Sequence, residues 1–578
     1  MRTISDIWSE AVAAGRPYPA YLVEEGGAWR EVSWAEAGRR VDELAAGFLD
    51  LGIHKGDRVA IVARSRLEWA LCDFALISIG AVVVPVYQTS SGPECAYVLE
   101  HSGARALVLE DDEQAAKLAP HLPKLSDLEH VISMERPAAG GLELAALTAR
   151  GRTLLEREPG AVDDARSAIR EDDELTYVYT SGTTGPPKGC VLLHRNYWVM
   201  VDMVDTVEGF WYERDSTVLF LPLAHVFGRL VEFGGARRGL TIAFCPDPAG
   251  IAVSLTAVRP TIFPSVPRIY EKVHAAVSAS LADAKGVRRK LVDWALSVGY
   301  RASACRERRR SYPPALALQF RLADRLVFSK VKARLGGRVR VPVSGGAPLA
   351  RGICAFFHAL DIRILEGYGL TESGTAATFN RPGNFRLGTV GLPLPGCEVR
   401  IADDGEILIR GENVFAGYYR DEDATRAAFT EDGWLRSGDI GLLDEDGFLT
   451  ITDRKKNLIV TAGGKNVAPQ NIENALKAAP LVSQALVIGD RRPYLTALVT
   501  IDDAEAAGLT PEEVRATVEG AVEAVNAGRG RVEQVKRFAI LPRDFSAEEG
   551  EITPTLKLKR RVCEEHFRAE IERLYASD

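Results

Sequence analysis

The sequence lacks the cysteine patterns that mark a structural zinc site or a disulfide framework. Its eight cysteines are widely scattered, and no two of them form a CxxC pair. Isolated cysteines of this kind are typical of reduced thiols in a reducing compartment. We therefore expect a cytoplasmic protein whose fold depends on neither disulfides nor zinc.

A hydrophobic run long enough to cross a membrane is also missing. The longest nearly apolar run extends from Phe74 to Tyr87 and contains Gly80 and Pro85, whereas a membrane-spanning helix needs about 20 apolar residues. The first ten residues include acidic side chains, and no apolar block follows them, unlike in a secretory signal peptide. The run instead predicts a buried helix followed by a strand.

Basic residues are fewer than acidic ones, with 71 lysines and arginines against 79 aspartates and glutamates. The resulting net charge of −8 argues against a general nucleic-acid-binding protein. One segment of helical pattern departs from this balance, because residues 281–340 hold sixteen lysines and arginines and only four acidic residues. This segment is either a solvated helical face, or a surface attracted to anionic lipid at the inner membrane face or to the phosphates of a large substrate.

The chain has 578 residues, of which 46% are apolar, so two or more domains are expected. Near the N-terminus, helical patterns, the first at 34–48, alternate with strand patterns at 56–63, 81–85 and 106–109. Ser33 is a candidate N-cap for the first helix. This alternation predicts an α/β fold with parallel βαβ units, in which ligands bind at the carboxyl ends of the strands.

A loop rich in glycine and hydroxyl side chains, residues 179–189, follows another predicted strand. Its glycines let the backbone approach an anion closely, and Lys188 supplies a positive charge suited to phosphate. The loop departs from the Walker pattern, because Pro187 stands where that pattern has its second glycine. By itself it is either a phosphate-binding loop of another kind or a flexible polar turn.

Polar residues in later turns are suited to a nucleotide and a metal. Tyr368 offers a flat face for stacking a base. Thr371 and Glu372 offer the oxygen ligands that Mg²⁺ prefers. Asp439 follows a tight turn and is suited to accept hydrogen bonds from a ribose diol, although a lone aspartate there is equally explained by turn stabilisation.

His225 follows a strand predicted at 218–223. An isolated histidine at a strand end is more often structural than catalytic. Its role therefore depends on what surrounds it.

A charged link, Asp453-Arg-Lys-Lys-Asn457, lies between two apolar stretches and is followed by a turn that contains Gly463 and Gly464. Such a junction predicts a domain boundary, which divides the chain into residues 1–455 and residues 456–578. The αβ pattern beyond the boundary suits a small α+β domain.

Six motifs follow one another along the chain, namely Thr180-Ser-Gly-Thr-Thr-Gly-Pro-Pro-Lys188, Leu221-Pro-Leu-Ala-His225, Tyr368-Gly-Leu-Thr-Glu372, Ser437-Gly-Asp439, Asp453-Arg-Lys-Lys456 and Lys557. Taken together and in this order, they resemble the core motifs of the acyl-adenylate-forming enzymes, which include acyl-CoA synthetases, firefly luciferase and peptide-synthetase adenylation domains. The chain is most similar to bacterial long-chain fatty acid–CoA ligases. The resemblance implies a large N-terminal domain of mixed sheets with helices, a hinge at Lys456 and a small mobile α+β C-terminal domain.

The reaction implied by this resemblance has two steps. A long-chain fatty acid reacts with ATP to give acyl-AMP and pyrophosphate, and coenzyme A then displaces AMP to give the thioester. Mg²⁺ is the implied metal, with Thr180 and Glu372 as its ligands. The alternatives are a ligase for another carboxylic acid, medium-chain or aromatic, and acyl transfer to a carrier protein. A non-catalytic nucleotide-binding or lipid-sensing relative would be marked by a broken Glu372, Asp439 or Lys557, and all three are present.

The same resemblance assigns roles to individual residues. Lys557 is implied to bridge the fatty carboxylate and the α-phosphate, with Lys559 as its rival, and Glu372 and His225 complete the catalytic set. Gly463 and Gly464 are implied to line the passage for coenzyme A. The residues implied to hold the nucleotide are Thr180, Ser181, Gly182, Thr183, Thr184, Lys188, Gly346, Glu366, Gly367, Tyr368, Thr371, Asp439, Arg454 and Lys456.

Overall fold

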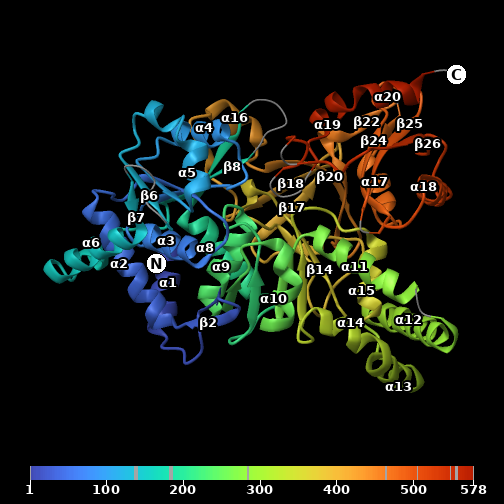
Figure 1. The fold of residues 1–578 in the computed structure, drawn as a ribbon, viewed down its shortest axis with the longest axis horizontal. Coiled ribbons are helices and arrows are strands. Elements are labelled where there is room, and N and C mark those ends of the chain that lie inside the picture. The colour runs from blue at the N-terminus through green and yellow to red at the C-terminus, as the bar shows by residue number, and fades with distance from the viewer. Residues whose placement is uncertain are drawn as a thin grey trace.

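The chain folds into a large N-terminal part and a smaller C-terminal part, which is drawn orange to red in Figure 1. Two buried apolar clusters of the smaller part draw only on residues between Ile459 and Ile571. This is the two-part α/β architecture that the sequence predicts, while the boundary at residue 456 stays a prediction. The computed structural model describes residues 2–135, 141–180, 186–282, 285–462, 465–503, 505–546, 549–553 and 558–576.

The largest sheet has eight strands, and its central strands β4, β3, β5 and β6 run parallel, as the alternating pattern predicts. Strand β8 is parallel to β4, but β9 is antiparallel to β8, so the two form a hairpin around the glycine-rich loop. In sheet order the strands are β19 (Gly417–Tyr418), β9 (Lys188–Leu193), β8 (Glu174–Thr180), β4 (Val82–Val86), β3 (Arg58–Val62), β5 (Ala106–Leu109), β6 (His130–Ser133) and β7 (Leu142–Glu143).

Helices that cover this sheet begin where local sequence predicts. The side chain of Ser33 accepts a hydrogen bond from the backbone N–H of Glu36 at 3.1 Å, which caps α2 (Trp34–Asp50). Helix α3 (Leu67–Ser78) is buried on nearly every side, so its apolar run shows no amphipathic period. The predicted helix-then-strand order of α3 and β4 is confirmed.

Three further sheets complete the N-terminal part. One has the order β10 (Ser216–Leu219), β11 (Thr241–Phe244), β1 (Tyr21–Glu25) and β2 (Ala28–Val32). A second has the order β12 (Ile262–Ser265), β13 (Val341–Ser344), β14 (Leu365–Tyr368), β15 (Thr378–Phe379) and β16 (Leu392–Pro393). The third has the order β17 (Cys397–Ile401), β18 (Glu406–Gly411), β20 (Leu435–Leu443) and β21 (Leu449–Arg454).

The strand predicted at 218–223 is shorter than expected, because β10 ends at Leu219. Pro222 has no N–H to continue a strand ladder. Its neighbours are held by a side chain instead, since the hydroxyl of Ser65 donates to the carbonyl of Leu221 and accepts from the N–H of Leu223. The segment after β10 therefore leads directly into helix α9 (Val226–Arg238).

The C-terminal part is an α+β domain, as predicted. Its sheet consists of β24 (Val482–Ile488), β25 (Leu495–Ile501) and β26 (Val535–Ile540), and the small hairpin of β22 (Ile459–Val460) and β23 (Asn466–Val467) precedes it. Four helices accompany these strands, namely α17 (Pro469–Lys477), α18 (Pro511–Asn526), α19 (Arg560–His566) and α20 (Arg568–Tyr575).

The basic segment is helical, as its pattern predicts. It contains the end of α11 (Pro267–Ala282), followed by α12 (Gly286–Glu307), α13 (Pro314–Ala323), a π-helical stretch (Asp324–Phe328) and α14 (Ser329–Arg334). Helices α12 and α13 project from one corner of the molecule (Figure 1). Across the described part of the chain, no helix is both long enough and apolar enough to span a membrane.

Candidate active site

A cavity of about 2120 Å³ lies where the carboxyl ends of several N-terminal strands face the C-terminal domain. Its N-terminal wall is formed by residues that end β8, β13 and β14, by the first half of β20 and by the start of α9. Its other wall comes from α17 and α19. The two domains are also in direct contact here, since the backbone N–H of Gln470 donates to the carboxylate of Asp453 at 3.1 Å.

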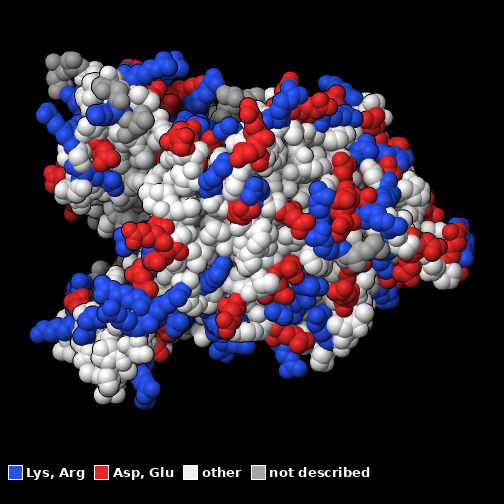
Figure 2. Space-filling model, turned by 180° about the vertical axis from the view of Figure 1, so that it is seen from behind, with Lys and Arg blue, Asp and Glu red and all other residues white. Residues whose placement is uncertain are grey.

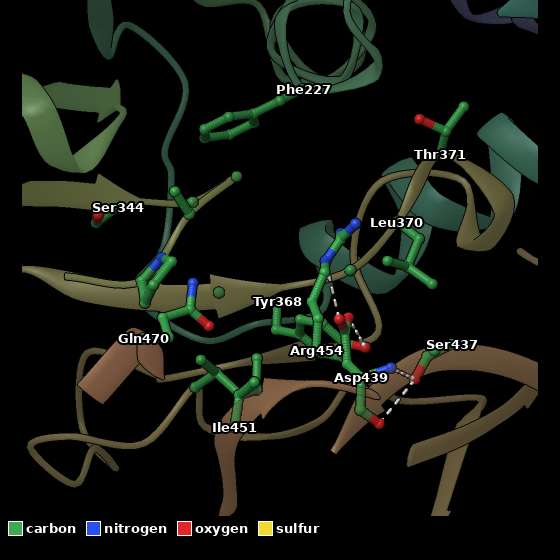
Figure 3. Close-up of a pocket in the computed structure, with 18 of the residues that line it drawn as sticks. Phe227, Ser344, Tyr368, Leu370, Thr371, Ser437, Asp439, Ile451, Arg454 and Gln470 are labelled. Atoms are coloured by element: carbon green, nitrogen blue, oxygen red, sulfur yellow. Dashed lines mark hydrogen bonds and ion pairs between the residues drawn. The ribbon is translucent and has the colours of Figure 1, made fainter. Parts of the chain in front are cut away.

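One end of the cavity holds a buried polar network centred on Asp439, which is 4% exposed. The hydroxyl of Tyr368 donates to one oxygen of Asp439 at 2.8 Å, and Nε of Arg454 lies 3.1 Å from the other (Figure 3). Asp439 and Arg454 are cross-strand partners in the β20–β21 pair. Strand pairing thus brings Asp439 and Arg454 together, and Tyr368 reaches Asp439 from β14 in a different sheet.

The sequence predicts a tight turn before Asp439, but this residue lies inside β20, where a register shift against β18 explains its position. Gly438 has a φ of +69°, which a glycine adopts without strain, and its N–H donates to the buried carboxylate of Glu406 at 3.0 Å. The N–H of Asp439 in turn donates to the hydroxyl of Ser437 at 3.0 Å. The aspartate is therefore oriented by this irregularity of β20 and keeps its carboxylate facing the cavity (Figure 3).

The glycine turn at 344–348 lines the cavity beside β14. Gly346 has a φ of +81° and no atom within 4 Å of the position where a Cβ would lie, so its place in the turn depends on backbone conformation and not on close packing. Gly367 is packed tightly, since a Cβ there would lie 2.8 Å from Phe379. Both glycines line the cavity, as does Thr371.

The other end of the cavity is formed by the base of the β8–β9 hairpin. Thr180 and Lys188 are cross-strand partners, so the two ends of the predicted phosphate loop lie side by side. The ammonium group of Lys188 is 3.3 Å from the carboxylate of Asp421. Ser181, Gly182, Thr183 and Thr184, which belong to the same prediction, lie outside the described residues.

Glu372 lies beside this hairpin and accepts a hydrogen bond at 2.8 Å from the hydroxyl of Tyr418, the cross-strand partner of Cys190 in β9. The ring of Tyr418 also lies 5.2 Å from the ammonium group of Lys188. Burial, reinforced by the Glu372 carboxylate, raises the pKa of Tyr418, so its hydroxyl stays a donor. Sequence analysis missed Tyr418 and Asp421, which stand in the strand and turn after β18 and carry no motif of their own.

His225 is the N-cap residue of α9, where its Nδ1 accepts a hydrogen bond from the backbone N–H of Phe227 at 3.1 Å. Its predicted place at a strand end is therefore wrong. The residue still lines the cavity. The capping bond explains the orientation of the ring, because a side-chain acceptor at this position satisfies a free N–H of the first helical turn.

Beyond His225 the cavity wall becomes apolar. Phe227, Leu230 and Val231 face it from α9, and Phe210 and Trp211 face it from the loop before β10. This arm of the cavity has the lining expected for an aliphatic ligand.

Residues 9–419 match the family model described as AMP-binding enzyme, and residues 456–578 match that of the AMP-binding enzyme C-terminal domain. The chain belongs to the AMP-binding enzyme family. It is 39% identical over 594 residues to the long-chain-fatty-acid–CoA ligase FadD15 of Mycobacterium bovis, with 97% of this chain and 95% of that relative covered. It is 31% identical over 629 residues to the long-chain-fatty-acid–CoA ligase ACSBG2 of Xenopus laevis, with 99% and 84% covered.

Solved structures share the fold. The anthranilate CoA ligase AuaEII in complex with anthranoyl-AMP matches with a TM-score of 0.75 at 20% identity, covering 99% of this chain and 98% of that one. A Mycobacterium tuberculosis fatty acyl CoA synthetase matches with a TM-score of 0.63 at 23% identity, covering 99% of both chains. At this level of identity, the structures establish the fold alone.

The C-terminal domain of this AMP-binding enzyme supplies polar groups to the cavity. Gln470 points into it opposite Arg454 (Figure 3), and Lys559 also lines it. Lys456, the predicted hinge, lies at the cavity wall, where burial and the charge of Arg454 lower its pKa. Lys557, Gly463 and Gly464 lie outside the described residues.

Glu366 in β14 makes the free energy of unfolding of the protein depend on pH. Burial raises the pKa of Glu366 from an ordinary 4.5 to about 8, so the folded protein favours the protonated carboxyl. This stability is fully present below pH 4.5 and is lost as the pH rises through 8. We expect the unfolding free energy of the wild type to fall by about 3 kcal/mol relative to Glu366→Gln between about pH 5 and about pH 8. Urea denaturation of both proteins at the two pH values measures this difference. The prediction would be refuted if the unfolding free energies of the two proteins changed in parallel with pH.

Tyr418→Phe tests the orientation of Glu372. The variant keeps the ring that faces Lys188 and removes only the hydroxyl that donates to Glu372. If Glu372 is a Mg²⁺ ligand, the Mg²⁺ concentration needed for half-maximal activity should rise about three- to tenfold, because a ligand loses its orienting partner. Tyr419→Phe is the matched control, since the neighbouring ring stacks on Tyr177 instead. An equal shift in both variants would count against the role of Tyr418.

Proposed function

We propose that this protein is a long-chain fatty acid–CoA ligase, which forms acyl-AMP from a fatty acid and ATP and then transfers the acyl group to coenzyme A. The observation that carries this proposal is full-length similarity to proteins named long-chain-fatty-acid–CoA ligases, with 39% identity over 97% of the chain. The cavity supports it, because one continuous cavity is lined by the polar residues Asp439 and Lys188 and by the apolar arm beyond His225.

The chain's own residues position the first step. The substrate carboxylate attacks the α-phosphorus and pyrophosphate leaves, so no protein nucleophile is needed. Tyr368 packs against the base, while Asp439 and Arg454 hold the ribose. Lys188 and the rest of the 180–189 loop hold the β- and γ-phosphates, and Lys557 neutralises charge between the carboxylate and the α-phosphate.

The residues present fit a magnesium ion bound chiefly through substrate phosphates. No group of three or more histidine, cysteine or carboxylate side chains within the described residues is placed to hold a metal alone. Mg²⁺ usually takes one or two carboxylates and completes its coordination with phosphate oxygens and water. Glu372 and the hydroxyl of Thr180 would hold the ion, which would neutralise phosphate charge during adenylation.

The second step calls for a different arrangement of the C-terminal domain. Lys557 would leave the site, and the turn at Gly463 and Gly464 would take its place, because small residues leave room for the pantetheine arm. We place the boundary between the domains at residue 456, with Lys456 as the hinge. His225 would orient the acyl carboxylate at the mouth of the apolar arm.

Trp211 is proposed to limit the length of the acyl chain. The indole lines the apolar arm, donates to Asp205 at 2.9 Å and packs so closely on α9 that a Cβ at Gly234 would lie 2.0 Å from it. We expect Trp211→Ala to shift the kcat/KM optimum toward longer acids and to cost about 3–5 kcal/mol of stability. The opposite change, Gly234→Ala, should push the indole into the arm and favour shorter acids.

Assays with acids from octanoate to stearate measure both variants. An unchanged chain-length profile in Trp211→Ala would refute this role. Thermal denaturation of the same preparations separates a loss of fold from a change of specificity.

The decisive test of the function is ATP–pyrophosphate exchange across a panel of carboxylic acids. Long-chain fatty acids are expected to stimulate exchange without coenzyme A, and coenzyme A is then expected to convert the acyl-AMP to thioester. If only aromatic or medium-chain acids stimulated exchange, the substrate would be an acid of that class and not a long-chain fatty acid. Transfer to a carrier protein but not to coenzyme A would replace the acceptor, and no exchange with any fatty acid would overturn the proposal.

We also propose a cytoplasmic location with peripheral contact to the inner face of the membrane. The support is the excess of basic residues in 281–340 within an otherwise acidic chain.

A further inference from the structure

Helices α12, α13 and α14 form a projection whose inner side is packed against the N-terminal domain. Leu316, Val327, Phe328 and Val331 are buried on this inner side. These buried apolar residues pack the projection onto the domain. They leave the outer side of the projection without a packing role.

The outer side exposes a row of leucines. Leu318 is 62% exposed, Leu322 46% and Leu326 44%. They are spaced four residues apart along one continuous helical run, so they project from the same side. Single exposed leucines are ordinary on protein surfaces, but a contiguous exposed row indicates a surface that binds something apolar.

Basic side chains surround this row. Arg321, Arg325 and Lys330 are exposed on the same helical run. Arg308, Arg309 and Arg310 are exposed at the end of α12. None of these six forms an ion pair within the described residues. Figure 2 shows the result at its lower left, where a white lobe is bordered by a dense blue patch.

Not every basic residue of the segment contributes to this surface. Arg306, at the centre of the densest cluster in the sequence, is turned inward, where it pairs with Asp361 at 3.2 Å and contacts the ring of Tyr312. Lys332 pairs with Asp324 and Asp361 in the same way. The charge count alone therefore overstates the free positive charge, and the six exposed residues named above are part of what remains free.

We infer that this leucine row and its basic border form a docking surface for an anionic lipid bilayer. The leucines would enter the boundary between head groups and acyl chains, and the arginines and lysine would contact lipid phosphates. A nucleic acid would use the charge but not the apolar row. The inference rests on the proposed function, because a long-chain fatty acid is supplied from bilayers.

Cosedimentation of the full-length protein with lipid vesicles tests the inference. The wild type is expected to bind vesicles of phosphatidylcholine with phosphatidylglycerol, to bind pure phosphatidylcholine weakly, and to dissociate as salt is raised. Neutralising Arg321, Arg325 and Lys330 with glutamine should lower the partition coefficient on the order of a hundredfold, since each basic residue contributes a factor of about five. Leu318→Gln, Leu322→Gln and Leu326→Gln, combined, should lower it at least tenfold, because the apolar contact is removed.

Two controls remove three basic or three apolar side chains elsewhere on the surface. The first is Arg157→Gln, Arg515→Gln and Arg573→Gln. The second replaces three exposed apolar residues, Val253, Leu442 and Leu509, with glutamine. Both controls should bind vesicles like the wild type. Vesicle binding does not depend on catalysis, so a failed exchange assay would overturn the proposed function and leave this measurement intact.

Three results would overturn the inference. The inference fails directly if the wild-type protein does not bind anionic vesicles. Leucine variants that bind as well as the wild type, while the basic variants do not, would indicate a general polyanion surface. A wild-type dimer that the leucine variants convert to a monomer would show that a second copy covers the row.

Discussion

Replacing Lys557 with alanine is expected to lower the rate of acyl-AMP formation by about 10³-fold or more while sparing thioester formation from supplied acyl-AMP. The reason is electrostatic, because adenylation brings a carboxylate against the α-phosphate and a positioned ammonium group offsets that repulsion. The neighbouring described residues Thr553 and Leu558 line the cavity. Fatty-acid-dependent pyrophosphate exchange measures the first step, and CoA-dependent release of AMP from purified acyl-AMP measures the second.

Lys559→Ala is the matched control for this prediction. Lys559 also lines the cavity, but it stands at the cap of α19, where its backbone N–H donates to the carbonyl of Glu551 at 2.7 Å. We expect a small effect on exchange from this variant. If Lys559→Ala abolished exchange and Lys557→Ala did not, the bridging role would pass to Lys559. Equal loss of both steps in Lys557→Ala would contradict a division of labour between them.

Asp439→Ala is expected to raise the KM for ATP by about 10²-fold and to destabilise the protein by about 2–3 kcal/mol. The carboxylate accepts from the hydroxyl of Tyr368 and pairs with Arg454, so its removal leaves a buried donor unsatisfied and a guanidinium unpaired. ATP titrations of the exchange reaction measure the first effect, and urea denaturation measures the second.

A second substitution separates these two effects. Tyr368→Phe removes one of the hydrogen bonds to Asp439 but leaves its charge and its contact with Arg454. It should cost about 1 kcal/mol of stability and change the KM for ATP only a few-fold. An unchanged KM in Asp439→Ala would contradict a role in nucleotide binding and leave Asp439 a structural residue of strand β20.

Local sequence was sufficient where a residue's partners lie within a few positions of it. The start of α2 depends on Ser33 and Glu36. The strand at 106–109 has the bounds that its apolar run predicts. The helical character of the basic segment follows from its spacing alone.

The sequence was insufficient where contacts join distant parts of the chain. Glu372 is oriented by Tyr418, which lies 46 residues away and belongs to no motif. His225 is a helix cap and not the end of a strand, because Pro222 and the hydroxyl of Ser65 end the strand early. Arg306 faces inward because Asp361 and the carbonyl of His358 are brought beside it.

By itself, then, the sequence determined the family, the two-part α/β fold and the order of the motifs along the chain. These depend on residue types and local spacing, which a linear pattern records. The tertiary structure alone decided which motif residues meet, how they are oriented and which basic side chains stay free at the surface. Those outcomes depend on strand pairing and on burial, which bring together side chains that are far apart in the sequence.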